Sequence, residues 1–374
     1  MVEVSRFYSA PDQPYGTHLA LRWNGRVRYI VPRTAAGQKA CWKLFHPGRL
    51  GFPLRAMARL PRLLGAVSCV EADKLASIRE AISKDAGLSC CRTGAPGPWS
   101  KDTILFLDQS AEPQYIVKAG AGEAVNSLLR NEAKWLRTLR SQASLVDHIP
   151  EVVAHRSGED LSFVVERPLQ GKFEHKLREL HFAFLRKLQE YSRQTMPLEE
   201  SRLYQNLRSR LKDLDGLLTQ AWSIRIEKAM RQIEQSLSGP AILFVAAHND
   251  FTPWNIRVQG GVARIFDWEY ADYEQLPLFD PLHFALMPMA LKRDKPQNML
   301  RRISRILQLC EQSLGKERCY AADTQALAYL VNLCTLFLWA DRGRCTQHPT
   351  IVSYAHLIDQ ISRSCSSMPG TARE

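Results

Sequence analysis

The apolar and polar positions change their spacing along the chain. In the first half, short runs rich in β-branched and aromatic residues predict strands, and the run over residues 18–33 folds back around Asn24-Gly25, a dipeptide suited to a tight hairpin. One helix interrupts them, because Leu129, Leu136 and their neighbours share a face. The predicted strands are 88–92, 101–108, 113–118, 151–156 and 161–166, with short helix 71–86 before them and helix 123–141 between them.

The second half of the chain has mostly helical spacing. Helices are predicted over 172–193, 203–217, 222–237 and from about 280 to 365, with strands at 241–247 and 262–266. Residues 48–66 mix Leu, Met and Arg and fit either an amphipathic surface helix or an irregular packed connection. Strands first and helices later indicate an α+β protein with two lobes. The predicted division is an N-terminal extension (1–86), a β-rich lobe with a hinge (87–170) and a helical lobe (171–374).

Positive charge is concentrated near the N-terminus. The chain carries 50 Lys and Arg against 38 Asp and Glu, a net charge of +12. Residues 1–70 hold 11 of these cations against only Glu3 and Asp12, so the rest of the chain is nearly neutral. This balance predicts an anionic partner and disfavours a strongly cationic one. The basic hairpin and the Arg/Leu segment fit an anionic membrane surface; the equal alternative is that the extension packs on the β-rich lobe with its arginines solvated.

The nine cysteines contain no CxxC pair, and their number is odd. We therefore predict reduced thiols in a cytoplasmic protein, peripheral to the membrane if the basic extension docks there. The N-terminus lacks the apolar stretch of a secretory signal. The longest uncharged run, residues 324–340, is shorter than a membrane span requires and contains Asn332, which favours a buried helix.

Three oxygen-bearing side chains follow the two predicted strands of the second half. Asp250 comes just after strand 241–247, Asn255 lies five residues further on, and Asp267 ends strand 262–266. Any one of them alone fits a turn or a strand terminus. Together, two carboxylates and a carboxamide at one end of a small sheet suit Mg²⁺, which prefers oxygen ligands.

The same residues carry a resemblance to a known family. His248-x-Asp250-x₄-Asn255, followed by Asp267-Trp-Glu and by Asp280, resembles the catalytic core of the aminoglycoside phosphotransferase and choline kinase group of small-molecule kinases. Protein kinases use related elements. The resemblance covers roughly residues 88–365 and implies a bilobal, protein-kinase-like fold with a small β-rich N-lobe, a mostly helical C-lobe and a basic extension outside the core.

The resemblance implies a Mg²⁺-dependent transfer of the γ-phosphate of ATP or GTP to a hydroxyl group. Asp250 would be the catalytic base, and Asn255 and Asp267 the metal ligands. Lys118, at the end of a strand, would hold the nucleotide phosphates, oriented by Glu132 of the next helix. Glu123 is a rival for Glu132, but a helix start often places an acid for the helix dipole alone.

The nucleotide would contact a glycine loop and the hinge between the lobes. The loop candidates are Gly94, Gly97 and Ser100, and the hinge candidates are the backbone groups near Glu166 and Leu169. The loop departs from the G-x-G-x-x-G pattern, since two prolines remove backbone donors. This departure favours an alternative function, that of a catalytically weak kinase-like nucleotide-binding or regulatory module.

Other residues near the motif have simpler interpretations. Asn249 replaces the usual glycine of the family and is tolerable if it adopts the left-handed region. We interpret His248 as a structural support of the loop, and Trp254 and Trp268 as core aromatics. No partner for His283 can be identified from the sequence pattern.

The acceptor is expected to be a small molecule or glycan that is not strongly cationic, and no nucleic-acid motif is present.

Overall fold

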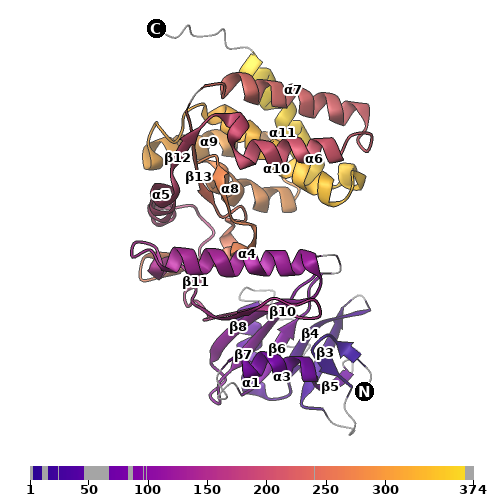
Figure 1. Ribbon diagram of the computed structural model, residues 1–374. Helices are drawn as coiled ribbons and strands as arrows, with labels where there is room; N and C mark the ends of the chain where they lie inside the picture. The colour runs from indigo at the N-terminus through magenta and orange to yellow at the C-terminus, as the bar shows by residue number, and fades with distance from the viewer. Residues whose placement is uncertain are drawn as a thin grey trace. The chain divides into compact units, whose positions relative to one another are not determined.

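The computed structural model describes residues 3–10, 16–23, 25–45, 67–82, 87–95, 97, 99–239 and 241–366. The chain forms two compact units, shown in Figure 1. Unit 1 comprises Met1–Gln142 and Ile149–Leu169, and unit 2 comprises Ala143–His148 and Gln170–Glu374. Within these described ranges, every helix is too short or too polar to cross a bilayer. The predicted segment 48–66 lies outside the described residues.

Unit 1 is built on one ten-stranded antiparallel sheet in the order β1-β2-β5-β3-β4-β6-β7-β8-β10-β9. The strands are β1 (Glu3–Ser5), β2 (Tyr8–Ser9), β3 (His18–Trp23), β4 (Arg26–Pro32), β5 (Val67–Glu71), β6 (Ser89–Arg92), β7 (Asp102–Leu107), β8 (Pro113–Gly120), β9 (Val152–Arg156) and β10 (Ser162–Glu166). The helices are α1 (Ala35–Phe45), α3 (Asp73–Glu80) and α4 (Glu123–Arg140). The five strands predicted between residues 88 and 166, and the helix predicted over 123–141 between them, are confirmed within one or two residues.

The N-terminal strands continue the sheet of the β-rich lobe. Strand β4 pairs with β6, with Ile30 opposite Cys91. The predicted hairpin is present as β3 and β4, and Gly25 has a φ of 74° at its turn. In its described residues, the extension therefore packs as part of unit 1.

A disulfide joins Cys41 of α1 to Cys90 of β6, with Cα atoms 6.4 Å apart. The prediction that all nine thiols are reduced is therefore wrong for this pair. The sequence separation of 49 residues hid the pairing, because only the folded sheet brings α1 over β6. Six cysteines of the described residues are free, and burial raises the pKa of Cys69 to about 12.

The two faces of the sheet carry different cores, because side chains alternate along a strand. Ile104 and Val117 face each other in register and belong to a core with Phe7 and Phe163. The opposite face packs a second core around Leu105, Leu107 and Trp42 of α1. On this second face, Val164 of β10 packs against Leu129 and Ala133 of α4. Helix α4 thus covers the end of the sheet formed by β8 and β10.

Unit 2 is mostly helical. Its helices are α5 (Glu179–Ser192), α6 (Arg202–Asp213), α7 (Gln220–Ser236), α8 (Phe279–Leu291), α9 (Pro296–Leu314), α10 (Ala322–Ala340) and α11 (Pro349–Ser366). Its strands are β11 (Lys172–Phe173), β12 (Gln194–Met196), β13 (Ile242–Ala247), β14 (Ile256–Gln259), β15 (Val262–Ile265) and β16 (Asp272–Gln275). Short 3₁₀ turns are η2 (Val146–His148), η3 (Leu198–Glu200), η4 (Pro253–Asn255), η5 (Trp268–Tyr270) and η6 (Arg344–Gln347).

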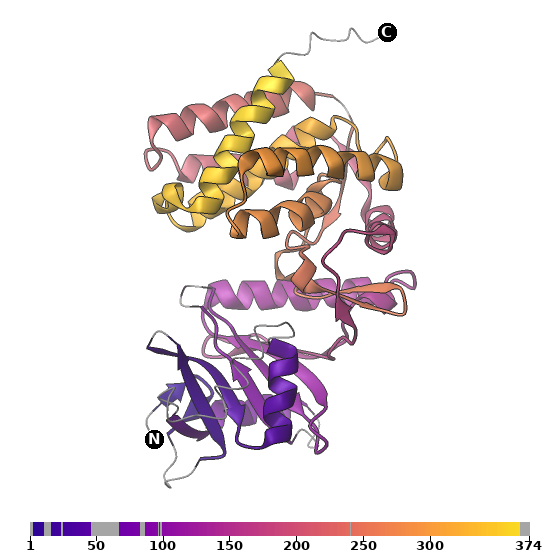
Figure 2. The ribbon, with the colours of Figure 1, turned by 180° about the vertical axis from the view of Figure 1, so that it is seen from behind.

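Helix α10 lies at the centre of the helical part and contacts α6, α7, α8 and α11, as the ribbon seen from behind in Figure 2 illustrates. This helix is the uncharged run 324–340, so its prediction as a buried helix is confirmed. The predicted helix 172–193 begins only at Glu179, because Lys172 and Phe173 pair with β14 instead. The two predicted strands are present as β13 and β15, and β13 also pairs with β16.

Candidate active site

The catalytic-loop motif follows strand β13 of unit 2. His248, the first residue after β13, is fully buried, and burial lowers its pKa to about 4, so the ring is neutral at pH 7. Its Nε2 lies 3.0 Å from the carbonyl oxygen of Phe266, and its Nδ1 accepts the backbone N–H of Asp250 at 3.2 Å. This geometry fits the predicted structural role, since both ring nitrogens are engaged by the backbone.

Asp280 of α8 supports the loop through hydrogen bonds to its backbone. Its carboxylate accepts the backbone N–H groups of His248 at 2.8 Å and Asn249 at 3.0 Å. Asn249 has a φ of 61°, the left-handed conformation in which an asparagine is tolerable at this turn. Burial raises the pKa of Asp280 to about 6, although the two N–H donors act in the opposite direction.

Asp250 is held through both carboxylate oxygens. Asn255 Nδ2 donates to Oδ2 at 2.8 Å and to the Asp250 carbonyl oxygen at 3.0 Å. His283 Nε2 lies 3.2 Å from Oδ1. The Asp250 side chain keeps 25% of its surface exposed, so a hydroxyl group can reach it. A carboxylate offers about four acceptor positions, and these contacts leave some of them open.

Asn255 and Asp267 leave the same end of the β14–β15 hairpin. Ile256 pairs with Ile265, and the Phe266 N–H donates to the Asn255 carbonyl oxygen at 3.1 Å. Asp267 has a φ of 74°, a left-handed conformation that is uncommon outside glycine. The hairpin therefore brings together these two predicted metal ligands.

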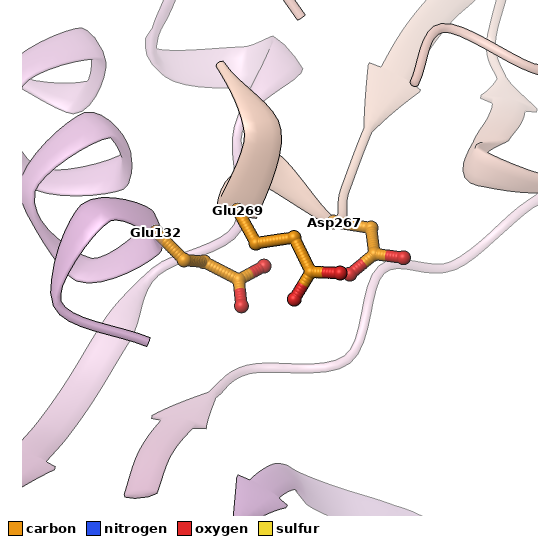
Figure 3. A group of neighbouring side chains, drawn as sticks. All are labelled: Glu132, Asp267 and Glu269. Carbon is orange, nitrogen blue, oxygen red and sulfur yellow. The ribbon is translucent and has the colours of Figure 1, made fainter. Parts of the chain in front are cut away.

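Glu269 is an oxygen donor that sequence reasoning did not select. Its carboxylate oxygen lies within 4.8 Å of one from Asp267, and its side chain is buried. Figure 3 shows these two side chains; Glu132, also labelled there, belongs to helix α4 of unit 1. Glu269 is part of the Asp-Trp-Glu motif, so the sequence contained a signal for it. The motif does not show, however, that the Glu269 side chain lies close to the Asp267 carboxylate.

Of the two tryptophans interpreted as core aromatics, one is buried and one is exposed. Trp268 is fully buried, as predicted, and packs edge-on to His248 with ring centroids 4.7 Å apart. Trp254 is 41% exposed, so its interpretation as a core aromatic is wrong. It lies in the loop between Asp250 and Asn255, where Phe251 is the buried aromatic side chain instead. Burial, together with the carboxylates of Asp267 and Asp250, raises the pKa of Tyr270 to about 12.

The predicted lysine–glutamate pair forms within unit 1. Lys118 is opposite Val164 in the β8–β10 register, so its side chain points to the face that α4 covers. There Lys118 Nζ donates to Glu132 Oε1, and both side chains are nearly or fully buried. Glu166, on the same face, lies 3.6 Å from Nζ. The rival Glu123 is at the exposed start of α4 and pairs with Arg130 at 3.6 Å.

The glycine loop and hinge are also in unit 1. The Gly94 N–H donates to the Asp102 carboxylate at 2.9 Å, so this amide is engaged inside the unit. A Cβ at Gly94 would lie 2.3 Å from the Lys101 carbonyl oxygen, which explains the glycine by close packing. The Ser100 N–H donates to the Gly97 carbonyl oxygen at 3.1 Å. In the hinge, Leu169 follows β10 and is half-buried.

Comparison with known proteins places this architecture in a family. A model of the phosphotransferase enzyme family matches residues 92–287, just over half of the chain. No curated protein sequence matches significantly. Among solved structures, the apo form of a thermostable mutant of aminoglycoside phosphotransferase APH(4)-Ia has a TM-score of 0.55 at 14% identity, covering 79% of this chain and 100% of its own.

A ternary complex of the same mutant enzyme with AMP-PNP and hygromycin B has a TM-score of 0.52 at 13% identity, covering 79% of this chain and 99% of its own. At such identities these likenesses establish the fold alone. The fold is the bilobal, kinase-like one that the sequence predicts. The chain belongs to the phosphotransferase enzyme family. It is therefore a kinase, which transfers a phosphoryl group from a nucleotide to a hydroxyl group of a small molecule.

Proposed function

We propose that this kinase transfers the γ-phosphate of ATP or GTP to a hydroxyl of a small molecule or glycan, with Asp250 as the base. The observation that carries the proposal is the fixed but accessible Asp250 carboxylate, held by Asn255 and His283. As the bond from the acceptor oxygen to the γ-phosphorus forms and the bond to the nucleotide's β–γ bridging oxygen breaks, Asp250 accepts the hydroxyl proton.

The donor set of the hairpin supports a Mg²⁺ site at Asn255 and Asp267. The Asn255 amide nitrogen donates twice to Asp250, so its Oδ1 is turned away from that residue and accepts no hydrogen bond from described residues. Carboxamide and carboxylate oxygens are ligands that Mg²⁺ prefers. When bound, the ion would neutralise charge on the nucleotide phosphates. Glu269 is an additional candidate ligand, because its oxygen lies close to that of Asp267.

We propose that Lys118, oriented by Glu132, neutralises the phosphate oxygens of the nucleotide. The nearly buried Lys118 amine has two acids within reach, which hold it in one direction. The Leu169 N–H makes no hydrogen bond to described residues, which supports the proposal that the hinge binds the base edge. Because the amides of Gly94 and Ser100 are both engaged, the Gly97 amide and the Ser100 hydroxyl are favoured for the phosphate contact.

A second candidate function is that of a catalytically weak nucleotide-binding module. The bond from Gly94 to Asp102 favours it, because a loop that lacks free amides holds phosphate less strongly. Titration of ATP and GTP in the presence of MgCl₂ distinguishes the two. Tight binding with turnover supports the kinase, whereas weak binding without turnover supports the module.

For the acceptor, the net charge of +12 disfavours a polycation and favours a neutral or anionic molecule. We also propose a cytoplasmic protein whose basic residues 1–70 contact an anionic membrane surface. Sedimentation with phosphatidylserine vesicles at low and high salt tests this part. Binding that disappears with salt supports it, and no binding at low salt contradicts it.

The main test is an acceptor screen with ATP or GTP and MgCl₂, including sugars and water, followed by Asp250→Asn and Asp267→Asn. Asp250→Asn should lose turnover while nucleotide affinity stays close to wild type. Asp267→Asn should also lose metal-dependent nucleotide binding. Unchanged turnover in both variants, or a complete absence of transfer by the wild type, contradicts the proposed function.

A further inference from the structure

His283 contacts the proposed catalytic base from inside the helical part of unit 2. Its Nε2 lies 3.2 Å from Asp250 Oδ1, and its Nδ1 lies 3.2 Å from the hydroxyl of Tyr329 on α10. Only 3% of His283 and 3% of Tyr329 is exposed, so water does not compete for these contacts. No role was predicted for His283, because neither partner is near it in the chain.

The partners of the ring determine its proton positions. An ionised carboxylate only accepts hydrogen bonds, so the contact with Asp250 requires a hydrogen on Nε2 of His283. In the neutral ring, Nδ1 is then the acceptor, and the Tyr329 hydroxyl donates to it. The Tyr329 hydroxyl thus stabilises the tautomer that donates to Asp250 by donating to the unprotonated Nδ1.

Helix α8 supports the catalytic loop at two levels. Asp280, in its first turn, holds the backbone N–H groups of His248 and Asn249. His283, one turn later on the same face, holds the side chain of Asp250. With Asn255 on the other oxygen, the plane of the Asp250 carboxylate is fixed by two donors, and its remaining lone pairs have a defined direction.

We propose that His283 is a positioning residue for phosphoryl transfer: its Nε2–H, set by Tyr329, orients the Asp250 carboxylate toward the acceptor hydroxyl. The proposal rests on Asp250 being the base, as proposed above. The acceptor proton moves to Asp250, whereas His283 keeps both its proton and its hydrogen bond. Because transfer depends on orientation, misdirecting the carboxylate is expected to lower kcat without weakening nucleotide binding.

The test uses the release of phosphate from ATP with MgCl₂, in which water is the acceptor, in full-length variants. His283→Leu removes the donor, and His283→Gln retains an N–H at similar reach. We expect His283→Leu to lower kcat about 10- to 100-fold with the KM for ATP unchanged, and His283→Gln to recover most of that loss. Equal losses in the two variants, or a wild-type kcat in His283→Leu, would overturn the proposal.

Two further variants keep the outcome decisive. Tyr329→Phe removes only a hydroxyl, and it should lower kcat several-fold at constant KM because the donating tautomer is no longer selected; if His283→Leu does not fold, an unchanged kcat here overturns the proposal. In an Asp250→Asn background, His283→Leu should cost no additional kcat. Full turnover in Asp250→Asn itself refutes the proposed base, whereas an inactive Asp250→Asn beside a fully active His283→Leu refutes only the role of His283.

Discussion

Replacing Asp280 by Asn tests how burial and hydrogen bonding compete at the base of the catalytic loop. The Asp280 carboxylate accepts two backbone N–H groups, which favour its ionised form, but it is only 2% exposed, which disfavours that form. Burial is the larger effect and raises the pKa from 3.8 to about 6. An Asn residue cannot ionise, so the variant removes this titration from the folded protein.

The sign of the pH effect follows from the raised pKa. Between about pH 4 and pH 6 the unfolded chain has lost the Asp280 proton while the folded protein keeps it, so stability decreases as the pH rises. Above about pH 6 both states are ionised and the contribution stays constant. One pKa unit corresponds to about 1.4 kcal/mol, so wild type should lose about 2 kcal/mol relative to Asp280→Asn between pH 4.5 and 7.5.

The assay is urea unfolding at four pH values, followed by far-UV circular dichroism, since most helices lie in unit 2. The quantity compared is the free energy of unfolding of wild type minus that of Asp280→Asn, which cancels the other titrating groups. Asp215→Asn removes an exposed carboxylate of unit 2 and is the matched control. A difference that stays constant would show that the N–H donors offset burial, and one that increases with pH would show that they outweigh it.

Three other substitutions test the structure at separate places. Lys118→Met leaves a buried acid without its cation and should destabilise unit 1 by about 3–5 kcal/mol in urea unfolding, with weaker ATP binding; equal stability contradicts a buried pair. Cys41→Ser opens the bridge to Cys90 and should cost about 4 kcal/mol by the chain-entropy model; if reductant destabilises wild type and the variant equally, the bridge is absent. Trp268→Ala should cost about 3–5 kcal/mol in the same assay, but the exposed Trp254→Ala under about 1 kcal/mol, and similar costs contradict the assigned burial.

Local sequence patterns predicted the elements that carry the site. The β-rich runs and the helix over residues 123–141 were correct because alternating and helical spacing are local properties. The pairing of Lys118 with Glu132 was implied by the resemblance to the small-molecule kinases and not by spacing alone, and the structure forms it. The loop from Asp250 to Asn255 was found because its two functional side chains lie five residues apart in one short segment.

What the sequence did not reveal depends on contacts between distant residues. The contact of His283 with Asp250 spans 33 residues, and the bridge from Cys41 to Cys90 spans 49. Spacing alone does not show which buried histidine faces which carboxylate. The one available signal for His283 was its position three residues after Asp280, which puts both on one face of α8.

The proposed phosphoryl transfer depends on Asp250 as its base. The most direct measurement is the single-turnover rate of γ-phosphoryl transfer from ATP in MgCl₂, compared between wild type and Asp250→Asn with ATP affinity measured in parallel. We predict that the variant binds ATP within about threefold of wild type but transfers about 10²- to 10⁴-fold more slowly. Equal transfer rates in the two proteins would show that Asp250 is not the base.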